Sequence, residues 1–187
     1  MNKLGSLMAL AAGLTLLSAC FMSATSLISP QDAVLPVDGP MTACLSDADP
    51  CIELTRRGDG YFAISPEDEN ESITLRFAPL AQAGQKQVFV AEVEMNEADE
   101  TAFIYGVMRR RDQPDARGAT IDVAPLDCDE MDETQDTAFT SAGGEIETGK
   151  IKSCMPSSFE QLKATILDMH GDDLAQDAWW AQRANEF

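Results

Sequence analysis

The sequence predicts an α+β fold: an antiparallel meander sheet of about six strands, or a partial barrel, packed against a C-terminal helix. Three observations support this fold class. Apolar residues recur at every second position through the middle of the chain, which is typical of half-buried strands. Short polar segments separate these stretches and favour antiparallel neighbours. After Pro156 the apolar spacing changes to three or four residues, as in an amphipathic helix.

Six stretches carry the alternating pattern. They are Ile52 to Leu54, Phe62 to Ile64, Ile73 to Phe77, Phe89 to Met95, Phe103 to Val107, and Ile121 to Val123. Each stretch has one apolar face. Because such a face must be buried against another element, we expect the sheet and the C-terminal helix to cover each other.

The first hairpin can be placed by its register. A three-residue loop, Gly58 to Gly60, puts Leu54, Phe62 and Ile64 on one face, whereas a two-residue loop separates them. We therefore predict the three-residue loop, in which Gly60 takes the left-handed position. The hairpin tip displays Arg57-Gly58-Asp59, which matches a known adhesion motif, but the turn alone accounts for these residues.

The C-terminal segment predicts two helices. Ser157 with Glu160 is a capping-box pattern, and Gly171 is a typical stop. Between them the apolar stripe consists of Phe159, Leu162, Ile166 and Met169. A second, shorter helix is expected from about Leu174 to Ala184.

Three aromatic residues near the C-terminus have structural rather than catalytic interpretations. His170 lies in the last turn of the first helix, where a cation opposes the helix dipole and satisfies carbonyl groups. Capping is therefore favoured over catalysis for His170. Trp179 and Trp180 are expected to pack on the sheet, although an exposed contact patch is the alternative.

The N-terminus has the three-part plan of a secretory signal. Lys3 supplies the positive start, and the apolar stretch from Leu7 to Ala19 is shorter than the ~20 residues that a membrane-spanning helix needs. The run Leu17-Ser18-Ala19-Cys20 follows and resembles the lipobox of bacterial lipoproteins. This resemblance covers only the leader. It implies diacylglyceryl attachment to the Cys20 thiol, cleavage before Cys20, and acylation of the new amino terminus.

The alternative is an ordinary signal peptide that is cleaved near Ala24, with Cys20 incidental. The lipobox reading divides the chain into a signal peptide (residues 1–19), Cys20 with a flexible tether (20–43), and a single α+β domain (44–187). The tether is expected from Pro30, Pro36 and Pro40 and from the lack of a hydrophobic period. An edge strand over residues 34–37 is the alternative.

The resemblance also implies a location in the cell envelope. In bacterial lipoproteins, Asp directly after the lipidated Cys is associated with retention in the inner membrane. Phe21 occupies this position here, which favours the outer membrane, with the folded domain facing the periplasm.

Four further cysteines predict two disulfides, because an even number in an oxidising compartment favours pairing. We expect Cys44 to pair with Cys51 and Cys128 to pair with Cys154. A zinc site is the competing interpretation, but no C-x-x-C spacing supports it.

Charge and composition exclude several functions. The chain carries 32 acidic and 13 basic side chains, a formal charge of −19, so a nucleic acid or an anionic membrane surface would repel it. Its single His excludes multi-histidine metal sites. No motif of a serine hydrolase, nucleotide-binding loop or zincin occurs. We therefore expect no catalytic residue, cofactor or metal ligand.

Two charged clusters remain as candidates. The acidic run within residues 127–136 could attract calcium, but it lacks the pattern of an EF-hand, and a solvated loop is favoured. Arg109, Arg110 and Arg111 form the one basic cluster after the leader. They could bind lipid phosphates or an acidic partner. Balancing local acids and protecting a strand end is mildly favoured.

The sequence thus indicates a lipid-anchored envelope protein with a binding or structural role. Its expected partners are the bilayer, through the covalent anchor, and another envelope protein. The first alternative is a calycin-like binder of a small apolar ligand. The second is an enzyme that uses paired carboxylates.

Overall fold

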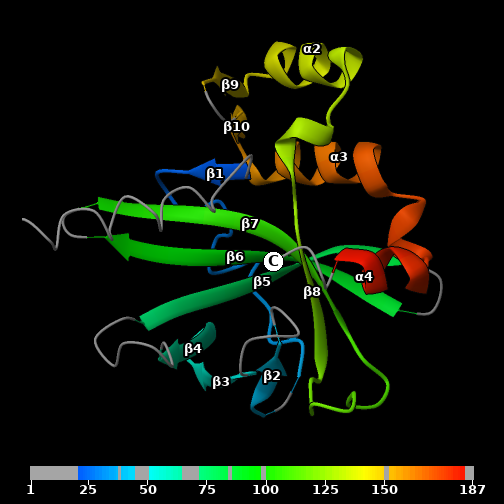
Figure 1. Cartoon of the computed structure of the whole chain (residues 1–187). Coiled ribbons are helices and arrows are strands. Elements are labelled where there is room, and N and C mark those ends of the chain that lie inside the picture. Colours follow the sequence, from blue (N-terminus) through cyan, green and yellow to red (C-terminus); the bar gives the residue numbers. More distant parts are fainter. Residues whose placement is uncertain are drawn as a thin grey trace, which may run out of the picture.

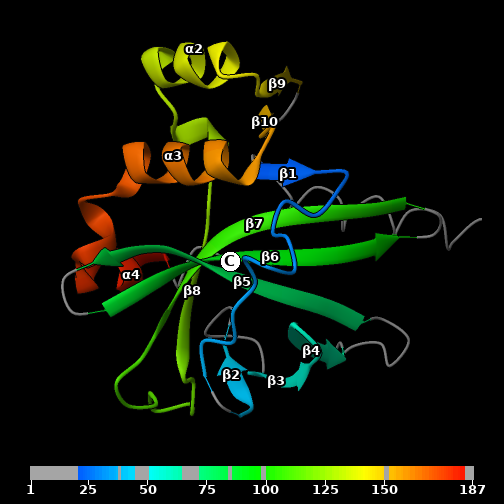
Figure 2. The same cartoon turned by 180° about the vertical axis from the view of Figure 1, so that it is seen from behind.

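The computed structural model describes residues 21–37, 39–44, 51–64, 72–83, 86–97, 100–149 and 152–183. These residues form a mixed α/β fold with a large, mostly antiparallel sheet that does not close, and three α-helices (Figure 1 and Figure 2). The strand order is β2-β3-β4-β5-β6-β7-β1-β10-β9, and β8 pairs with β7 off this path. The described sheet has ten strands, so the prediction of about six was too low.

The elements have the following bounds. The strands are β1 (Phe21–Ser23), β2 (Met41–Ala43), β3 (Ile52–Arg57), β4 (Gly60–Ile64), β5 (Ser72–Ala83), β6 (Lys86–Glu97), β7 (Glu100–Arg110), β8 (Ile121–Pro125), β9 (Glu145–Thr148) and β10 (Lys152–Met155). The helices are α2 (Glu133–Ser141), α3 (Phe159–His170) and α4 (Asp177–Arg183), with 3₁₀ turns at Cys128–Glu130 and Asp173–Ala175.

The six stretches with alternating apolar residues correspond to strands β3 to β8. They form the expected antiparallel meander, since each of these strands pairs with the next along the chain. The longest pairings join β5 to β6 and β6 to β7, and these strands form the centre of the sheet. This part of the predicted fold is confirmed.

The centre of the sheet is buried on both faces. In β6, Val88 and Val90 belong to one core, whereas Phe89 and Ala91 belong to another. Because successive side chains of a strand point to opposite faces, the two cores lie on opposite sides of the sheet. The expectation of a single apolar face was therefore incomplete for the central strands.

Each core has its own cover. On one face, α3 and α4 contribute Leu162, Ile166 and Trp180 to the core. On the other face the sheet curls, and β2 to β4 contribute residues such as Leu54 and Tyr61. In the views of Figure 1 and Figure 2, α2 and α3 lie at one end of the molecule and β2 to β4 at the opposite end.

The first hairpin has the two-residue loop, so the predicted three-residue loop was wrong. Thr55 pairs with Phe62, and Arg57 with Gly60. The core residue of β4 is Tyr61, which is fully buried, while Phe62 lies on the opposite face beneath the Arg57 guanidinium. Gly60 is needed for another reason: a Cβ there would lie 2.4 Å from the carbonyl oxygen of Leu75.

Residues 21–37 and 39–43 are part of the folded body, so the flexible tether predicted for this segment was wrong. Phe21 has no exposed surface, and its strand lies between β7 and β10. Met41 is also fully buried, in β2. The alternative was an edge strand over residues 34–37, and of this strand the structure has one isolated β-bridge, between Val34 and Phe77. Strands of three residues are too short to show a period, and for this reason the sequence pattern missed them.

Both predicted disulfides are present. Cys44 is bonded to Cys51, and Cys128 is bonded to Cys154. The second bond ties the 3₁₀ turn after β8 to β10, and both of its cysteines are fully buried. One disulfide therefore joins the end of β2 to the start of β3, and the other lies beside β1, which pairs with β10.

The C-terminal helices match the prediction closely. The helix α3 begins one residue later than expected, with Ser158 as the cap that accepts from the Gln161 N–H, and it ends at Gly171. The second helix is a 3₁₀ turn followed by α4, and Ala184 lies outside the described residues. None of the described helices is both long and apolar enough to cross a membrane.

Candidate functional site

The arginine cluster lies at the end of β7, and its three members have different environments. Arg109 is buried. Its Nε donates to Asp122 at 2.8 Å, its Nη1 donates to Asp177 at 2.5 Å, and its guanidinium lies 4.9 Å from the centre of the Trp180 ring. Such a guanidinium has both its charge and its flat face occupied. Arg109 therefore joins α4 to the sheet and is structural.

Arg111 is also committed to local acids. Its Nη2 lies 2.5 Å from Asp122 and 3.7 Å from Asp115. Asp122 is thus shared by Arg109 and Arg111, as the interpretation of local charge balance expects. Hydrogen bonds from Lys86 and Arg109 lower the pKa of Asp177, which keeps this carboxylate ionised beside the cluster.

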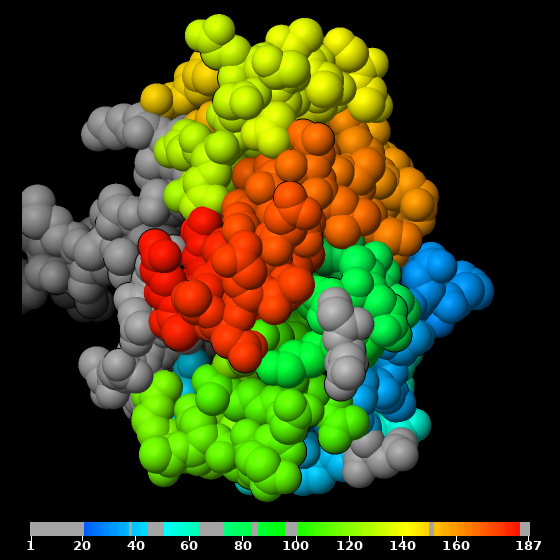
Figure 3. Space-filling view, turned by 90° about the vertical axis from the view of Figure 1, so that its right-hand side faces the viewer, coloured from blue at the N-terminus to red at the C-terminus, as the bar shows by residue number. Residues whose placement is uncertain are grey.

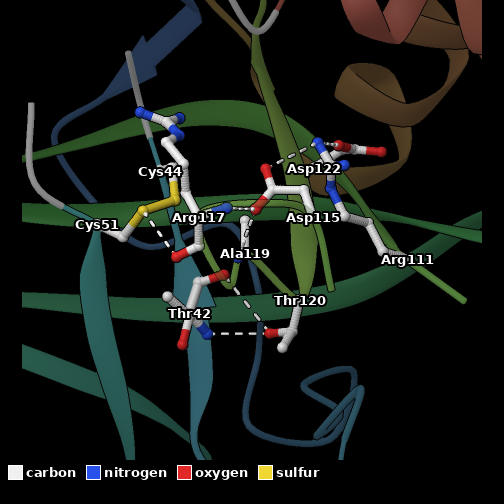
Figure 4. The surroundings of a disulfide bond; sticks show 9 residues. All are labelled: Thr42, Cys44, Cys51, Arg111, Asp115, Arg117, Ala119, Thr120 and Asp122. Atoms are coloured by element: carbon white, nitrogen blue, oxygen red, sulfur yellow. Dashed lines mark hydrogen bonds and ion pairs between the residues drawn. A yellow bond between two sulfur atoms is a disulfide. The ribbon is translucent and has the colours of Figure 1, made fainter. Parts of the chain in front are cut away.

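The loop that follows the arginine cluster and leads to β8 is held in place by several hydrogen bonds (Figure 4). Burial opposes ionisation of Asp115, but hydrogen bonds from the Ala119 and Arg117 N–H groups prevail and lower its pKa. The Thr120 N–H donates to the Thr42 carbonyl at 3.0 Å, and Cys51 Sγ lies 3.9 Å from the Arg117 carbonyl. The loop, the end of β2 and the Cys44–Cys51 disulfide therefore form one connected unit.

Arg110 has no ion-pair partner among the described residues and is exposed. It follows Arg109 in the strand, so it points to the opposite face, which is the face of Phe89 and Met108. The pairing of Val88 with Arg109 brings Gln87 and Lys86, the next residues outward on β6, to the same end of the sheet. Arg110 is therefore placed beside other hydrogen-bond donors.

A cleft of about 390 Å³ opens at this end of the sheet. Three cations and one acid line it, together with one polar and two apolar side chains. The lining residues are Pro36, Lys86, Gln87, Phe89, Arg110, Arg111 and Asp112. Figure 3 looks at this side of the molecule, where α4 (red) lies between α3 (orange) and the light green segment that follows β7. Small-molecule sites are clefts or cavities of about 300–1,000 Å³.

The acidic run forms a 3₁₀ turn and the start of α2, so the loop expected there is corrected, whereas Asp129, Glu130, Asp132 and Glu133 are exposed, as expected of solvated charges. Asp127 caps the 3₁₀ turn, and Asp132 with Gln135 forms a capping box on α2. Asp136 pairs with Lys152 at 2.7 Å. Within the described residues, no group of three or more histidine, cysteine or acidic side chains is arranged to hold a metal ion.

His170 is the last residue of α3 and is buried, with its Nε2 3.4 Å from Glu130 and its ring against Trp179. Burial lowers the pKa of His170, partly offset by Glu130. Its Nε2 has no hydrogen-bond partner, so it does not satisfy a helix carbonyl as predicted. Trp180 packs in the core as expected, with its indole N–H donating to the Leu174 carbonyl.

Glu92 is not among the predicted residues, although its carboxylate is fully buried. It accepts hydrogen bonds from five donors: the Ser26 hydroxyl, the Leu27 and Ile28 N–H groups, the Tyr105 hydroxyl and Arg76. In a strand with alternating apolar residues Glu92 occupies a position that would normally face solvent, so the pattern gave no signal of burial. Burial also raises the pKa of the Tyr105 hydroxyl.

The remaining predicted residues are placed as follows. Gly58 and Asp59 form the hairpin tip, with Asp59 3.6 Å from Arg76. Cys20 and the leader lie outside the described residues.

Comparisons of the chain with protein-family models, curated proteins and solved structures find no match.

Proposed function

We propose that this chain is a lipoprotein of the bacterial cell envelope, anchored through Cys20, whose folded body is a non-enzymatic binding module. The observation that carries the proposal is the sequence Leu17-Ser18-Ala19-Cys20 directly behind a short apolar stretch. The two disulfides support it, since such bonds persist in oxidising compartments outside the cytosol. The outer membrane, with the body facing the periplasm, is the location we propose.

The position of Phe21 bears on how such an anchor would hold the folded body at the bilayer. Phe21 is fully buried and paired on both sides, and consecutive Cα atoms are only about 3.8 Å apart. A lipid on Cys20 would therefore be joined to the central sheet without a spacer. We propose that the body rests directly against the bilayer, rather than reaching out from it on a tether.

Lipid attachment is tested by metabolic labelling with a fatty-acid analogue. The wild-type chain should incorporate label and Cys20→Ala should not. The matched control is the Cys44→Ala/Cys51→Ala double variant, which removes two other cysteines and should label normally. Equal incorporation in the wild type and in Cys20→Ala would contradict the anchor.

The missing spacer is tested by neutron reflectometry of the lipidated protein on a supported bilayer. A twelve-residue Gly/Ser insertion between Cys20 and Phe21 should open a water layer of about 20 Å, the mean span of such a linker. The wild type should show no such layer. A layer of similar thickness in the wild type would exclude direct contact.

The cleft beside Arg110 favours binding at the end of the sheet over the alternative of a small apolar ligand inside the curled sheet. The curl is filled by side chains such as Tyr61, Phe77 and Met108, each of which is fully buried. The proposed binding role therefore belongs to the end of the sheet.

A further inference from the structure

We propose that the cleft at the ends of β6 and β7 binds a small oxyanion that carries an apolar group. The acidic group, a carboxylate or a phosphate, is held by Arg110, with Lys86 at the rim of the cleft, and the apolar group lies on Phe89 and Pro36. This inference specifies the binding role proposed above, but it does not depend on the lipid anchor.

The charge distribution at the cleft supports an anion. The chain is strongly acidic overall, so most of its surface repels anions. The cleft is lined by Lys86, Arg110, Arg111 and one acid, Asp112. Lys86 is paired with Asp177, and Arg111 with Asp115 and Asp122, so Arg110 is the lining cation that has no ion pair among the described residues. Arg110 keeps all of its guanidinium donors for a ligand, because no described residue forms an ion pair with it. A free guanidinium binds carboxylate or phosphate oxygens through two parallel hydrogen bonds.

Lys86 also lines the cleft, and its ammonium group is held on the side of the sheet that α4 covers. Its Nζ lies 3.1 Å from Asp177, whose same oxygen also accepts from Arg109 at 2.5 Å. The side chain of Asp177 is 75% exposed, so solvent weakens its hold on Lys86. Lys86 is therefore restrained but keeps N–H donors for a ligand.

The cleft also has an apolar wall and a suitable size. Phe89 belongs to the core inside the curl, and Pro36, on the chain before β2, lines the same cleft. A volume of 390 Å³ is at the lower end of the range for small-molecule sites. The site therefore fits a small molecule with an acidic end, such as an aromatic acid or phosphate ester, or the headgroup and first carbons of an anionic lipid.

Asp112 makes the proposal sharply testable, since it is exposed at the same cleft and repels an anion. The test uses the purified full chain in a neutral detergent, with phenyl phosphate as the probe and isothermal titration calorimetry as the readout. Arg110→Ala should weaken binding about tenfold or more, the size of one lost hydrogen bond to a charged group. Lys86→Ala should weaken binding as well, and Asp112→Asn should strengthen it.

Arg56→Ala is the control, because Arg56 is exposed on β3, outside the cleft lining. It should bind as the wild type does. Benzyl alcohol, which has the ring without the charge, should not compete. Thermal unfolding of each variant separates loss of the site from loss of the fold.

A second arm distinguishes a free ligand from a lipid. The protein is mixed with phosphatidylcholine vesicles that do or do not contain phosphatidylglycerol, and the Cys20→Ala variant removes the anchor. Phenyl phosphate binding supports a soluble ligand, and phosphatidylglycerol-dependent binding that Arg110→Ala removes supports a lipid headgroup. The proposal is overturned if neither probe binds, or if binding is unchanged in folded Arg110→Ala.

Discussion

The Leu27 N–H donates to the buried carboxylate of Glu92 at 2.9 Å, and this contact fastens the N-terminal segment to the middle of the sheet. The same carboxylate also accepts from Ser26 and from Ile28. Successive backbone N–H groups that converge on one carboxylate make strong, charge-assisted hydrogen bonds. Glu92 thus compensates for its burial by holding a loop that begins three residues after β1.

Replacing Glu92 should destabilise the protein strongly. In Glu92→Ala, the donors from Ser26 to Ile28 and Tyr105 lose their common acceptor inside the protein. Removing one partner of a buried charged network costs about 3–5 kcal/mol. Urea denaturation measures this loss, and Glu53→Gln, an exposed change on β3, is the control. A loss below about 1 kcal/mol would show that the network contributes little.

Stability should fall on acidification through the titration of His170, the only histidine in the chain. Burial lowers its pKa in the folded state below the ordinary value of 6.5, despite Glu130 and Asp173 nearby, and Arg183 acts in the same direction as burial. The unfolded chain therefore binds the proton more readily, so stability is full above pH 6.5 and is lost as pH falls towards the folded pKa. His170→Gln should flatten urea midpoints between pH 7.5 and 5.5. An unchanged slope in that variant would assign the loss to other groups.

The two disulfides should contribute unequally. Cys128–Cys154 spans 26 residues and Cys44–Cys51 spans 7. On the chain-entropy estimate, the first contributes about 3.5 kcal/mol and the second about 2.4 kcal/mol. Replacing each pair by alanine and measuring unfolding by urea tests this order. A larger loss at Cys44–Cys51 would indicate that its contact with the Arg117 loop matters more than loop length.

The hairpin offers a test of close packing. Gly60→Ala places a Cβ within 2.4 Å of the Leu75 carbonyl oxygen, so β4 and β5 must separate locally. A loss of about 1–3 kcal/mol is expected, as in other overpacked sites. Gly58→Asn is the matched change: Gly58 has a φ of +64° and open space around it, and Asn tolerates this backbone region. Equal losses in the two variants would show that backbone freedom, rather than crowding, explains Gly60.

The central strands could be predicted from the sequence because their apolar residues alternate over long stretches. The strands β1, β2, β9 and β10 could not, since strands of three or four residues carry no measurable period. The helix α2 was missed for a different reason. It buries only Phe139 and is otherwise polar and acidic, so its sequence resembles a charged loop.

The candidate site was predictable only in part. The three arginines stand out in an acidic chain, but the sequence cannot show that acids on β8 and α4 occupy Arg109 while Arg110 turns to the other face. Lys86 and Gln87 join the cleft through strand register, which no local pattern encodes. The two disulfides were predicted correctly because both pairings are the closest in sequence.

The position of β1 has a consequence for the order in which the chain folds. Phe21 pairs with Tyr105 and with Cys154, so this strand finds its neighbours only after most of the polypeptide has been synthesised. Long-range pairing of this kind is completed late in folding. Until then the residues of β1 have no strand partner, and the sheet cannot be completed between β7 and β10.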